Sequence, residues 1–260
     1  MTYDENLLDL APFDRIPPPI IDSQGSIVPE DSGLLKPTGK ANGRVVILNS
    51  GHGGYHRNNG NFDVGSYSFV KKGNGKYAPH LEYEKVRPYV NEIAEELRAQ
   101  GYAVVITSGE VHSFSGTNAL DNIIQGLTDG SKADGTKYKK QDMVFVSFHA
   151  DSSAKQDDDN DKSSVCYNPQ YSSSVQFAQT LNNNLNHYPN TWVKSEMAER
   201  IPGQNGVYVL TTTSSQIPAV LLETAHINGV KGRKNLDSSK FREQFIESTI
   251  IGINEPFGIK

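Results

Sequence analysis

Three ionisable side chains, His52, His149 and Glu223, each stand at or just after the end of a short apolar segment. Strand interiors exclude such groups, because burying an unpaired ionisable side chain costs several kcal/mol. Three such endings in one chain indicate that the strand ends meet. Two histidines and a carboxylate are a common ligand set for catalytic zinc, with water in the remaining position. A further carboxylate that does not bind the metal would then act as general base.

Glu223 is one candidate for the carboxylate ligand. Glu82 and Glu84, at the start of a predicted helix over residues 81–100, are two others. The apolar positions of this helix are Val86, Val90, Ile93 and Leu97, which lie on one face of a 3.6-residue period. Counting back four residues from Val86 reaches Glu82, whereas Glu84 falls on the solvent side. We therefore favour Glu82 as the inward carboxylate. Glu84 stays open, because residues at a helix start can depart from the ideal phase.

The segments that must position these groups are strands that alternate with helices. The predicted strands are 45–48, 102–107, 143–148, 164–168, 206–210 and 218–222, and the predicted helices are 81–100, 118–127, 172–187 and 238–253. After the first strand, Gly51 helps to break the apolar run and delivers His52 at the carboxyl edge, where α/β sheets place catalytic groups. The alternation predicts an α/β fold, a three-layer domain with a central, mostly parallel or mixed sheet flanked by helices.

The composition of the 260-residue chain excludes several classes of protein. The formal net charge is −5 and no basic stripe occurs, so we expect no nucleic-acid partner. Cys166 is the single cysteine, which excludes an intrachain disulfide and a cysteine-based metal site. No apolar run approaches the roughly 18 residues of a membrane span. The acidic N-terminus does not resemble a signal peptide, so we expect a cytoplasmic protein until it is released.

Residues 1–43 differ from the rest of the chain, because they hold six of the 13 prolines and little periodicity. We interpret them as a proline-rich N-terminal arm or linker with a docking segment for a partner, and residues 44–260 as the catalytic domain. Residues 55–79 are predicted to form a long polar loop. The aspartate-rich residues 157–161 are interpreted as a solvated loop, because the glycine and distal glutamate of a calcium-binding EF-hand loop are missing.

The other histidines carry weaker signals. His56, His80, His112 and His187 are expected at the surface or in loops. His226 lies three residues after Glu223 and is predicted either to reach the rim of the site or to pack against the loop that contains Asn228.

Three motifs resemble the zinc-dependent N-acetylmuramoyl-L-alanine amidases of the type 3 family: GHGG at 51–54, SFHAD at 147–151 and PAVLLETAHIN at 218–228. The resemblance covers about residues 44–253. It implies that His52, Glu82 or Glu84, and His149 hold zinc and that Glu223 is the catalytic acid and base. The spacing to the glycine that ends the helix, Gly101, favours Glu82. Glu84 and Lys85 match the Glu-Lys pair that the family often has at the ligand, so both glutamates stay open.

The reaction implied by this resemblance is hydrolysis of the amide between N-acetylmuramic acid and L-alanine of the peptidoglycan stem peptide. Ser108 stands where the family usually has arginine, and residues 71–79 and 129–141 look like insertions. A zinc peptidase acting on the stem peptide and a catalytically silent wall-binding or structural component are the alternative functions. The implied settings are a phage lysin, a tail or injection particle, or release at mother-cell lysis.

Overall fold

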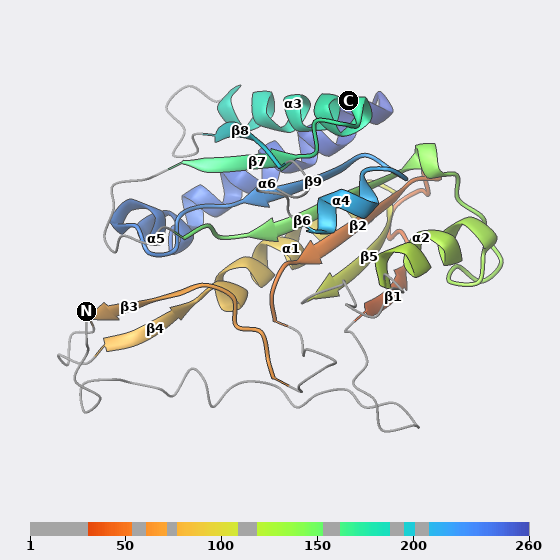
Figure 1. The fold of residues 1–260 in the computed structure, drawn as a ribbon. Helices are drawn as coiled ribbons and strands as arrows, with labels where there is room; N and C mark the ends of the chain where they lie inside the picture. The colour runs from red at the N-terminus through yellow and green to blue at the C-terminus, as the bar shows by residue number, and fades with distance from the viewer. Residues whose placement is uncertain are drawn as a thin grey trace.

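In a computed structural model that describes residues 31–53, 61–71, 77–108, 119–152, 162–187, 195–200 and 208–259, nine strands form one large sheet and one hairpin (Figure 1). The large sheet holds β1 (Asp31–Leu35), β2 (Val45–Ser50), β5 (Ala103–Ser108), β6 (Met143–His149), β7 (Ser163–Tyr167), β8 (Ser195–Glu199) and β9 (Ala219–Glu223). The hairpin consists of β3 (Tyr67–Lys71) and β4 (Tyr77–Leu81). The helices are α1 (Glu82–Ala99), α2 (Ala119–Asp129), α3 (Ser172–His187), α4 (Tyr208–Thr213), α5 (Val230–Leu236) and α6 (Ser239–Asn254), with short 3-10 helices at Lys140–Asp142 and Glu255–Phe257.

The large sheet is mixed, with the strand order β1-β5-β2-β6-β9-β7-β8. The four central strands β5, β2, β6 and β9 are parallel, β1 and β7 pair antiparallel to their inner neighbours, and β8 runs parallel to β7. The parallel centre brings the carboxyl ends of β2, β6 and β9 to one edge, where such sheets place their ligands. The predicted sheet flanked by helices is confirmed.

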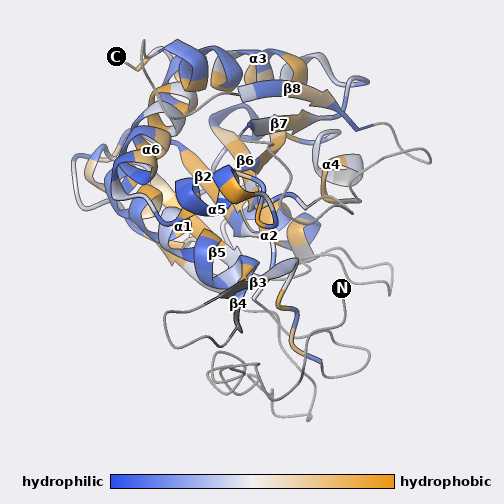
Figure 2. Ribbon diagram, turned by 90° about the vertical axis from the view of Figure 1, so that its left-hand side faces the viewer, coloured by the Kyte–Doolittle hydropathy of each residue, from blue (hydrophilic) through white to orange (hydrophobic). Residues whose placement is uncertain are grey.

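Strand β2 shows why the fold has three layers. Val46 and Leu48 belong to the core formed with α1, α3 and α6, whereas Val45 and Ile47 belong to the core formed with α2 and α4. All four side chains are fully buried, as expected for a strand covered on both faces. Each contributes about 1.5–3 kcal/mol through burial, so the strand before His52 is firmly fixed. In Figure 2 the central strands carry orange residues, while the surrounding helices alternate orange and blue.

Helix α1 confirms the predicted periodic face, because Val86, Val90, Ile93 and Leu97 are all buried. The helix begins at Glu82, directly after the last residue of β4. Ala150 N, directly after β6, donates to Glu82 Oε1 at 2.8 Å, so the amino end of α1 lies at the carboxyl end of β6.

Buried side-chain hydrogen bonds join β6, β2 and β5 near their carboxyl ends. Ser147 Oγ donates to Asn49 Oδ1 at 2.7 Å, and Asn49 Nδ2 donates to Thr107 Oγ1 at 2.9 Å. Each such bond contributes about 0.5–1.5 kcal/mol. This network fixes the strand ends immediately before the segments that carry His52 and His149.

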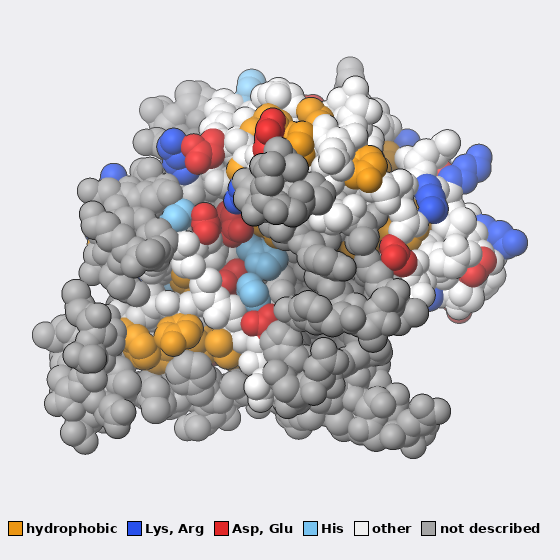
Figure 3. All heavy atoms as spheres, in the orientation of Figure 1, with side chains coloured by type: hydrophobic (Ala, Val, Ile, Leu, Met, Phe, Trp, Pro, Cys, Tyr) orange, Lys and Arg blue, Asp and Glu red, His pale blue; other side chains and the backbone are white. Residues whose placement is uncertain are grey.

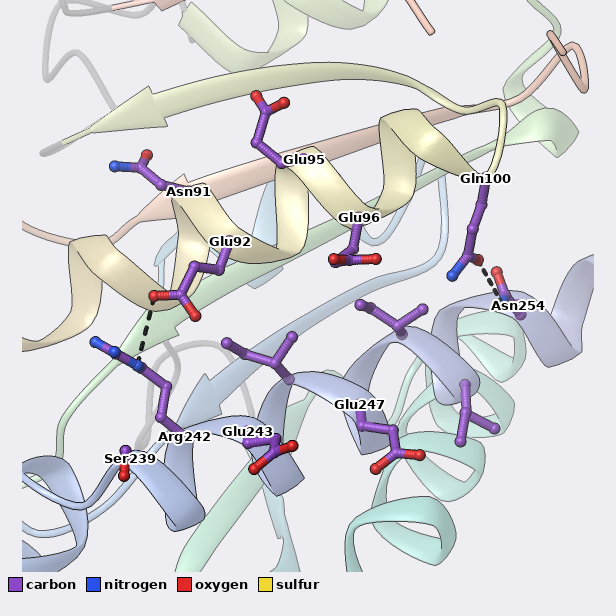
Figure 4. A pocket seen from close by; sticks show the side chains of 13 residues that line it. Asn91, Glu92, Glu95, Glu96, Gln100, Ser239, Arg242, Glu243, Glu247 and Asn254 are labelled. Carbon is purple, nitrogen blue, oxygen red and sulfur yellow. Dashed lines mark hydrogen bonds and ion pairs between the residues drawn. The ribbon is translucent and has the colours of Figure 1, made fainter. Parts of the chain in front are cut away.

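Helices α1 and α6 enclose a groove of about 910 Å³ (Figure 4). Arg242 Nε and Glu92 Oε1 span it at 3.4 Å, and Asn254 Nδ2 donates to Gln100 Oε1 at 2.9 Å. The lining includes the five carboxylates of Glu92, Glu95, Glu96, Glu243 and Glu247. None of the sequence-predicted site residues lines this groove, so it is separate from the candidate site.

Two predicted segments were wrong. Residues 55–79, predicted as one loop, include β3 and the start of β4. These two strands are held together by backbone hydrogen bonds to each other, which their polar side chains do not predict. Residues 208–210, predicted as part of a strand, lie in α4. Val209 and Leu210 are buried in the core beside α2, and such a short apolar run does not distinguish helix from strand. Strands β1 and β8 and helix α5 were not predicted.

Strand β1 lies inside the segment interpreted as the N-terminal arm and pairs with β5. Residues 1–30 lie outside the described residues, so the division at residue 43 stays a prediction. The acidic residues 157–161 also lie outside them. Across the described ranges, no helix is both long and apolar enough to cross a bilayer.

His80, expected at the surface, is instead buried in β4, with Nε2 3.2 Å from Asp237 Oδ1. Burial, reinforced by the charge of Lys85, lowers the pKa of His80 to about 4, although Asp237 opposes the shift. In the unfolded chain this pKa returns to about 6.5. Between these values the unfolded chain binds more protons, so the free energy of unfolding falls as the pH decreases through this window.

The variant His80→Gln is therefore expected to reduce the acid destabilisation between about pH 6.5 and pH 4, by up to about 3 kcal/mol. Glutamine keeps a donor for Asp237 and does not take up a proton in this range. Urea unfolding of parent and variant above, within and below the window measures the effect. Equal losses of stability in both proteins would contradict this prediction.

Candidate active site

His52, Glu82 and His149 come together at the carboxyl edge of the sheet, and one ligand atom from each lies within 4.8 Å of the others. His52 Nε2 is 3.4 Å from Glu82 Oε2, and His149 Nδ1 is 3.2 Å from Glu82 Oε1. The two imidazoles pack edge to face with ring centroids 4.8 Å apart. Figure 3 shows histidine and carboxylate side chains gathered in the middle of one face. Two nitrogens and one oxygen around a common point form a donor set suited to zinc.

The structure separates the two candidate glutamates. Glu82 is 2 % exposed, and its carboxylate accepts hydrogen bonds from Ser66 N at 2.7 Å and Ala150 N at 2.8 Å. Glu84 is partly exposed and lines a hollow on the outside of α1, together with Lys85. The helical face argument therefore placed Glu82 correctly beside the histidines.

Burial acts to raise the pKa of Glu82, because a charged carboxylate is less stable away from water. The hydrogen bond with His149 and the charges of the two imidazoles outweigh this effect, and the Ala150 N–H contributes in the same direction. The net pKa lies below the ordinary value. Glu82 is consequently ionised at neutral pH, the form that binds a metal cation.

Asp63 orients His52 and was not identified from the sequence. Asp63 Oδ2 lies 2.6 Å from His52 Nδ1, so Nδ1 carries the donated proton and Nε2 is directed towards Glu82. Asp63 Oδ1 also accepts a hydrogen bond from Gly65 N at 3.0 Å. A carboxylate behind a histidine ligand fixes the tautomer and raises the basicity of the ring. Asp63 lies in a segment without periodicity, which is why sequence patterns did not single it out.

Two glycines leave space for the cluster. A Cβ atom on Gly51 would lie 2.0 Å from His149 Nε2. A Cβ atom on Gly65, which has φ of +69°, would lie 2.6 Å from His52 Cδ2 and 2.7 Å from Glu82 Oε2. The backbone thus approaches both imidazoles more closely than any residue with a side chain permits.

Replacing Asp63 by alanine is expected to weaken zinc binding about 10–100-fold, because His52 loses the group that fixes its tautomer and orientation. Competition with a chromophoric chelator measures the affinity. Asp129→Ala is the matched control, since Asp129 also accepts a hydrogen bond from the backbone two residues on, at Ser131 N, but is not part of the cluster of His52, Glu82 and His149. Unchanged zinc affinity in Asp63→Ala would exclude the orienting role.

Glu223 ends β9, where it pairs in register with His149 of the neighbouring parallel strand. Paired positions of adjacent strands present their side chains on the same face of a sheet. Its Oε2 is buried and has no hydrogen-bond partner among the described residues. Burial, together with the charges of Asp151 and Glu82, raises the pKa of Glu223 well above its ordinary range, while Arg200 opposes the shift. A buried polar atom without a partner requires an explanation, and a group that exchanges protons with a substrate provides one.

His226 pairs with Asp151 beside this edge, with Nε2 3.1 Å from Asp151 Oδ2. Ile227 N donates to Asp151 O at 2.8 Å, and Thr224 N donates to His149 O at 2.8 Å. These bonds tie the segment after β9 to the segment after β6. His226 therefore lies next to the predicted site but outside the three-residue cluster. His187 lies at the end of α3, and His56 and His112 lie outside the described residues.

Several solved structures share this fold. The catalytic domain of CwlV, an N-acetylmuramoyl-L-alanine amidase from Bacillus (Paenibacillus) polymyxa var. colistinus, has 22 % identity and a TM-score of 0.54, covering 84 % of this chain and 99 % of that one. AmiC2 of Nostoc punctiforme, another such amidase, has 22 % identity and a TM-score of 0.53, covering 83 % and 97 %. The CwlD amidase of Clostridioides difficile, in complex with the GerS lipoprotein, has 16 % identity and a TM-score of 0.52, covering 84 % and 100 %.

At these identities the structural likeness establishes the fold. No curated protein sequence matches the chain. The sequence model of the type 3 family, described as N-acetylmuramoyl-L-alanine amidase, matches residues 46–255 and so includes every residue of the site described above. The chain belongs to the type 3 N-acetylmuramoyl-L-alanine amidase family.

Proposed function

We propose that the protein is a zinc-dependent peptidoglycan hydrolase that cleaves the amide between N-acetylmuramic acid and L-alanine of the stem peptide. The observation that carries this proposal is the position of the Glu223 carboxyl, whose Oε2 has no hydrogen-bond partner among the described residues, beside the cluster of His52, Glu82 and His149. Membership of the amidase family supplies the substrate class.

The donor set fits zinc better than the hard divalent cations. Mg²⁺ and Ca²⁺ prefer sites made of oxygen ligands, whereas this cluster offers two imidazole nitrogens and one carboxylate. His52 would bind through Nε2, because Nδ1 is engaged by Asp63, and His149 through Nδ1, which faces Glu82. When bound, zinc supplies a Lewis acid and lowers the pKa of its water to about 7.

Glu223 is assigned the proton transfers. As a carboxylate it accepts the proton of the attacking water, and as a carboxylic acid it donates that proton to the departing nitrogen of L-alanine. Its burial and the neighbouring negative charges favour the protonated form and so suit the second step. Asp63 keeps His52 in one tautomer, and the backbone N–H groups of Ser66 and Ala150 hold the Glu82 carboxylate in place.

The test is digestion of purified peptidoglycan by the full chain, stripped with EDTA and then restored with zinc. We expect zinc-dependent release of intact stem peptides that begin with a free L-alanine amine, identified by mass spectrometry. Fragments cut within the stem peptide would instead indicate the peptidase alternative. Tight zinc binding with no cleavage would favour the silent wall-binding component.

A further inference from the structure

The β3–β4 hairpin is attached to the cluster of His52, Glu82 and His149 both where the chain enters it and where the chain leaves it. Ser66, the residue before β3, donates its N–H to Glu82 Oε2 at 2.7 Å and accepts a hydrogen bond from Glu82 N at 3.0 Å. At the other end, β4 leads directly into Glu82. Ser68 Oγ also donates to Ile227 O at 2.9 Å, on the segment that follows Glu223. The hairpin is therefore fixed relative to both the cluster and Glu223.

The two faces of β3 differ in character. Ser68 is fully buried against the body of the protein, so the alternation of a strand directs Tyr67 and Phe69 to the opposite face. Their rings pack edge to face with centroids 5.7 Å apart. Tyr67 is 49 % exposed, and it is the large hydrophobic side chain that the described part of the chain leaves most open to solvent. In Figure 3 a hydrophobic band crosses the position of β3 and β4, on the same face as the site.

Two uncharged hydroxyl groups lie where the hairpin begins. Ser66 Oγ and Ser152 Oγ are 3.0 Å apart and exposed, one preceding the hairpin and the other following His149 by three residues. Hydroxyl groups both donate and accept hydrogen bonds. Rigid aromatic faces beside a few uncharged polar groups match a ligand that has an apolar face and many hydroxyls.

We propose that Tyr67 and Phe69 form a saccharide subsite, on which a pyranose ring of the glycan strand stacks while the scissile amide lies at the cluster. The inference rests on the proposed function, because that function places a glycan strand beside His52 and Glu223. A pyranose ring presents C–H groups on one face, which pack against an aromatic ring, and hydroxyls at its edge. The stem peptide carries carboxylates and amino groups, whereas the rings of Tyr67 and Phe69 and the hydroxyls of Ser66 and Ser152 are uncharged.

The test is calorimetric binding of two separate probes to the zinc-loaded full chain: glycan strands freed of all stem peptides, and the stem peptide alone. We expect Tyr67→Ala to weaken glycan binding about tenfold, a change that corresponds to about 1.4 kcal/mol of binding free energy, because the variant loses the exposed ring. Tyr67→Trp is expected to retain the affinity, and stem-peptide binding is expected to be unchanged. Tyr171→Ala, before α3, is the control for loss of a partly exposed tyrosine elsewhere.

Glycan binding that is equal in the parent and Tyr67→Ala, or absent in the parent, would overturn the subsite. Weaker binding of the stem peptide in Tyr67→Ala, with glycan binding unchanged, would assign the surface to peptide and also overturn it. Because neither probe contains the scissile amide, the result is independent of catalysis. A chain that binds glycan through Tyr67 but cleaves no peptidoglycan would contradict the proposed function alone.

Discussion

Replacing Glu223 by glutamine is expected to lower kcat/KM for peptidoglycan hydrolysis by about 10²–10⁴-fold, the contribution typical of a positioned general acid and base. Zinc affinity is expected to stay near that of the parent, because Glu223 is not one of the three residues whose ligand atoms converge. The two measurements are the rate of L-alanine amine release from peptidoglycan and the zinc stoichiometry of the purified variant.

The substitution removes the ability of residue 223 to transfer protons while keeping the shape of its side chain. Glutamine has nearly the volume of glutamate and keeps an oxygen, but its amide neither accepts the proton of water nor donates a proton as an acid does. Stability is expected to change little or to rise, since Oε2 has no hydrogen-bond partner among the described residues and the buried carboxyl is electrostatically disfavoured.

Glu199→Gln is the matched control, because Glu199 also ends a strand of the same sheet but is exposed and is bonded by Tyr167 OH at 3.3 Å. It is expected to hydrolyse peptidoglycan at the parent rate. Near-parental turnover in Glu223→Gln would remove the proton-transfer role. Loss of zinc from Glu223→Gln would make Glu223 a ligand instead.

The parts of the fold that were predicted correctly are those fixed by burial on a repeating pattern. Strand β2 is apolar throughout because both faces are covered, and α1 repeats its apolar residues along one face. In each case one local pattern and the tertiary environment agree. Strand β8 and hairpin β3–β4 lacked such agreement, because their side chains are mixed and their strands are specified mainly by backbone pairing.

The only site residues that could be predicted were those placed by the end of a strand or by the phase of a helix. His52, His149 and Glu223 follow buried strands, and the parallel register then brings His149 and Glu223 side by side. Asp63 reaches His52 through an irregular segment whose course depends on Gly65 and on the hydrogen bonds of Ser66. Neither periodicity nor composition encodes that course, so the residue that orients a ligand had to come from the structure.

A pair of substitutions, Glu82→Gln and Glu84→Gln, is expected to give opposite results although they lie two residues apart and change the charge equally. Glu82→Gln is expected to weaken zinc binding by more than the about 10–100-fold typical of a residue that only orients a ligand, because Glu82 is proposed to bind the metal directly. A comparable loss of activity is expected. Glu84→Gln is expected to match the parent in both. Chelator competition and peptidoglycan hydrolysis measure the two effects, and thermal unfolding verifies that both variants fold.

The contrast follows from helix geometry, since two residues along a helix are separated by about 200° of rotation. Glu82 therefore faces the imidazoles and the N–H groups of Ser66 and Ala150, while Glu84 faces outwards. Zinc loss in Glu84→Gln with normal binding in Glu82→Gln would transfer the ligand role to Glu84. That result would require the first turn of α1 to rotate away from the phase that buries Val86, which would break the hydrogen bonds that fix Glu82. The pair thus tests the ligand assignment and the helical phase on which it depends.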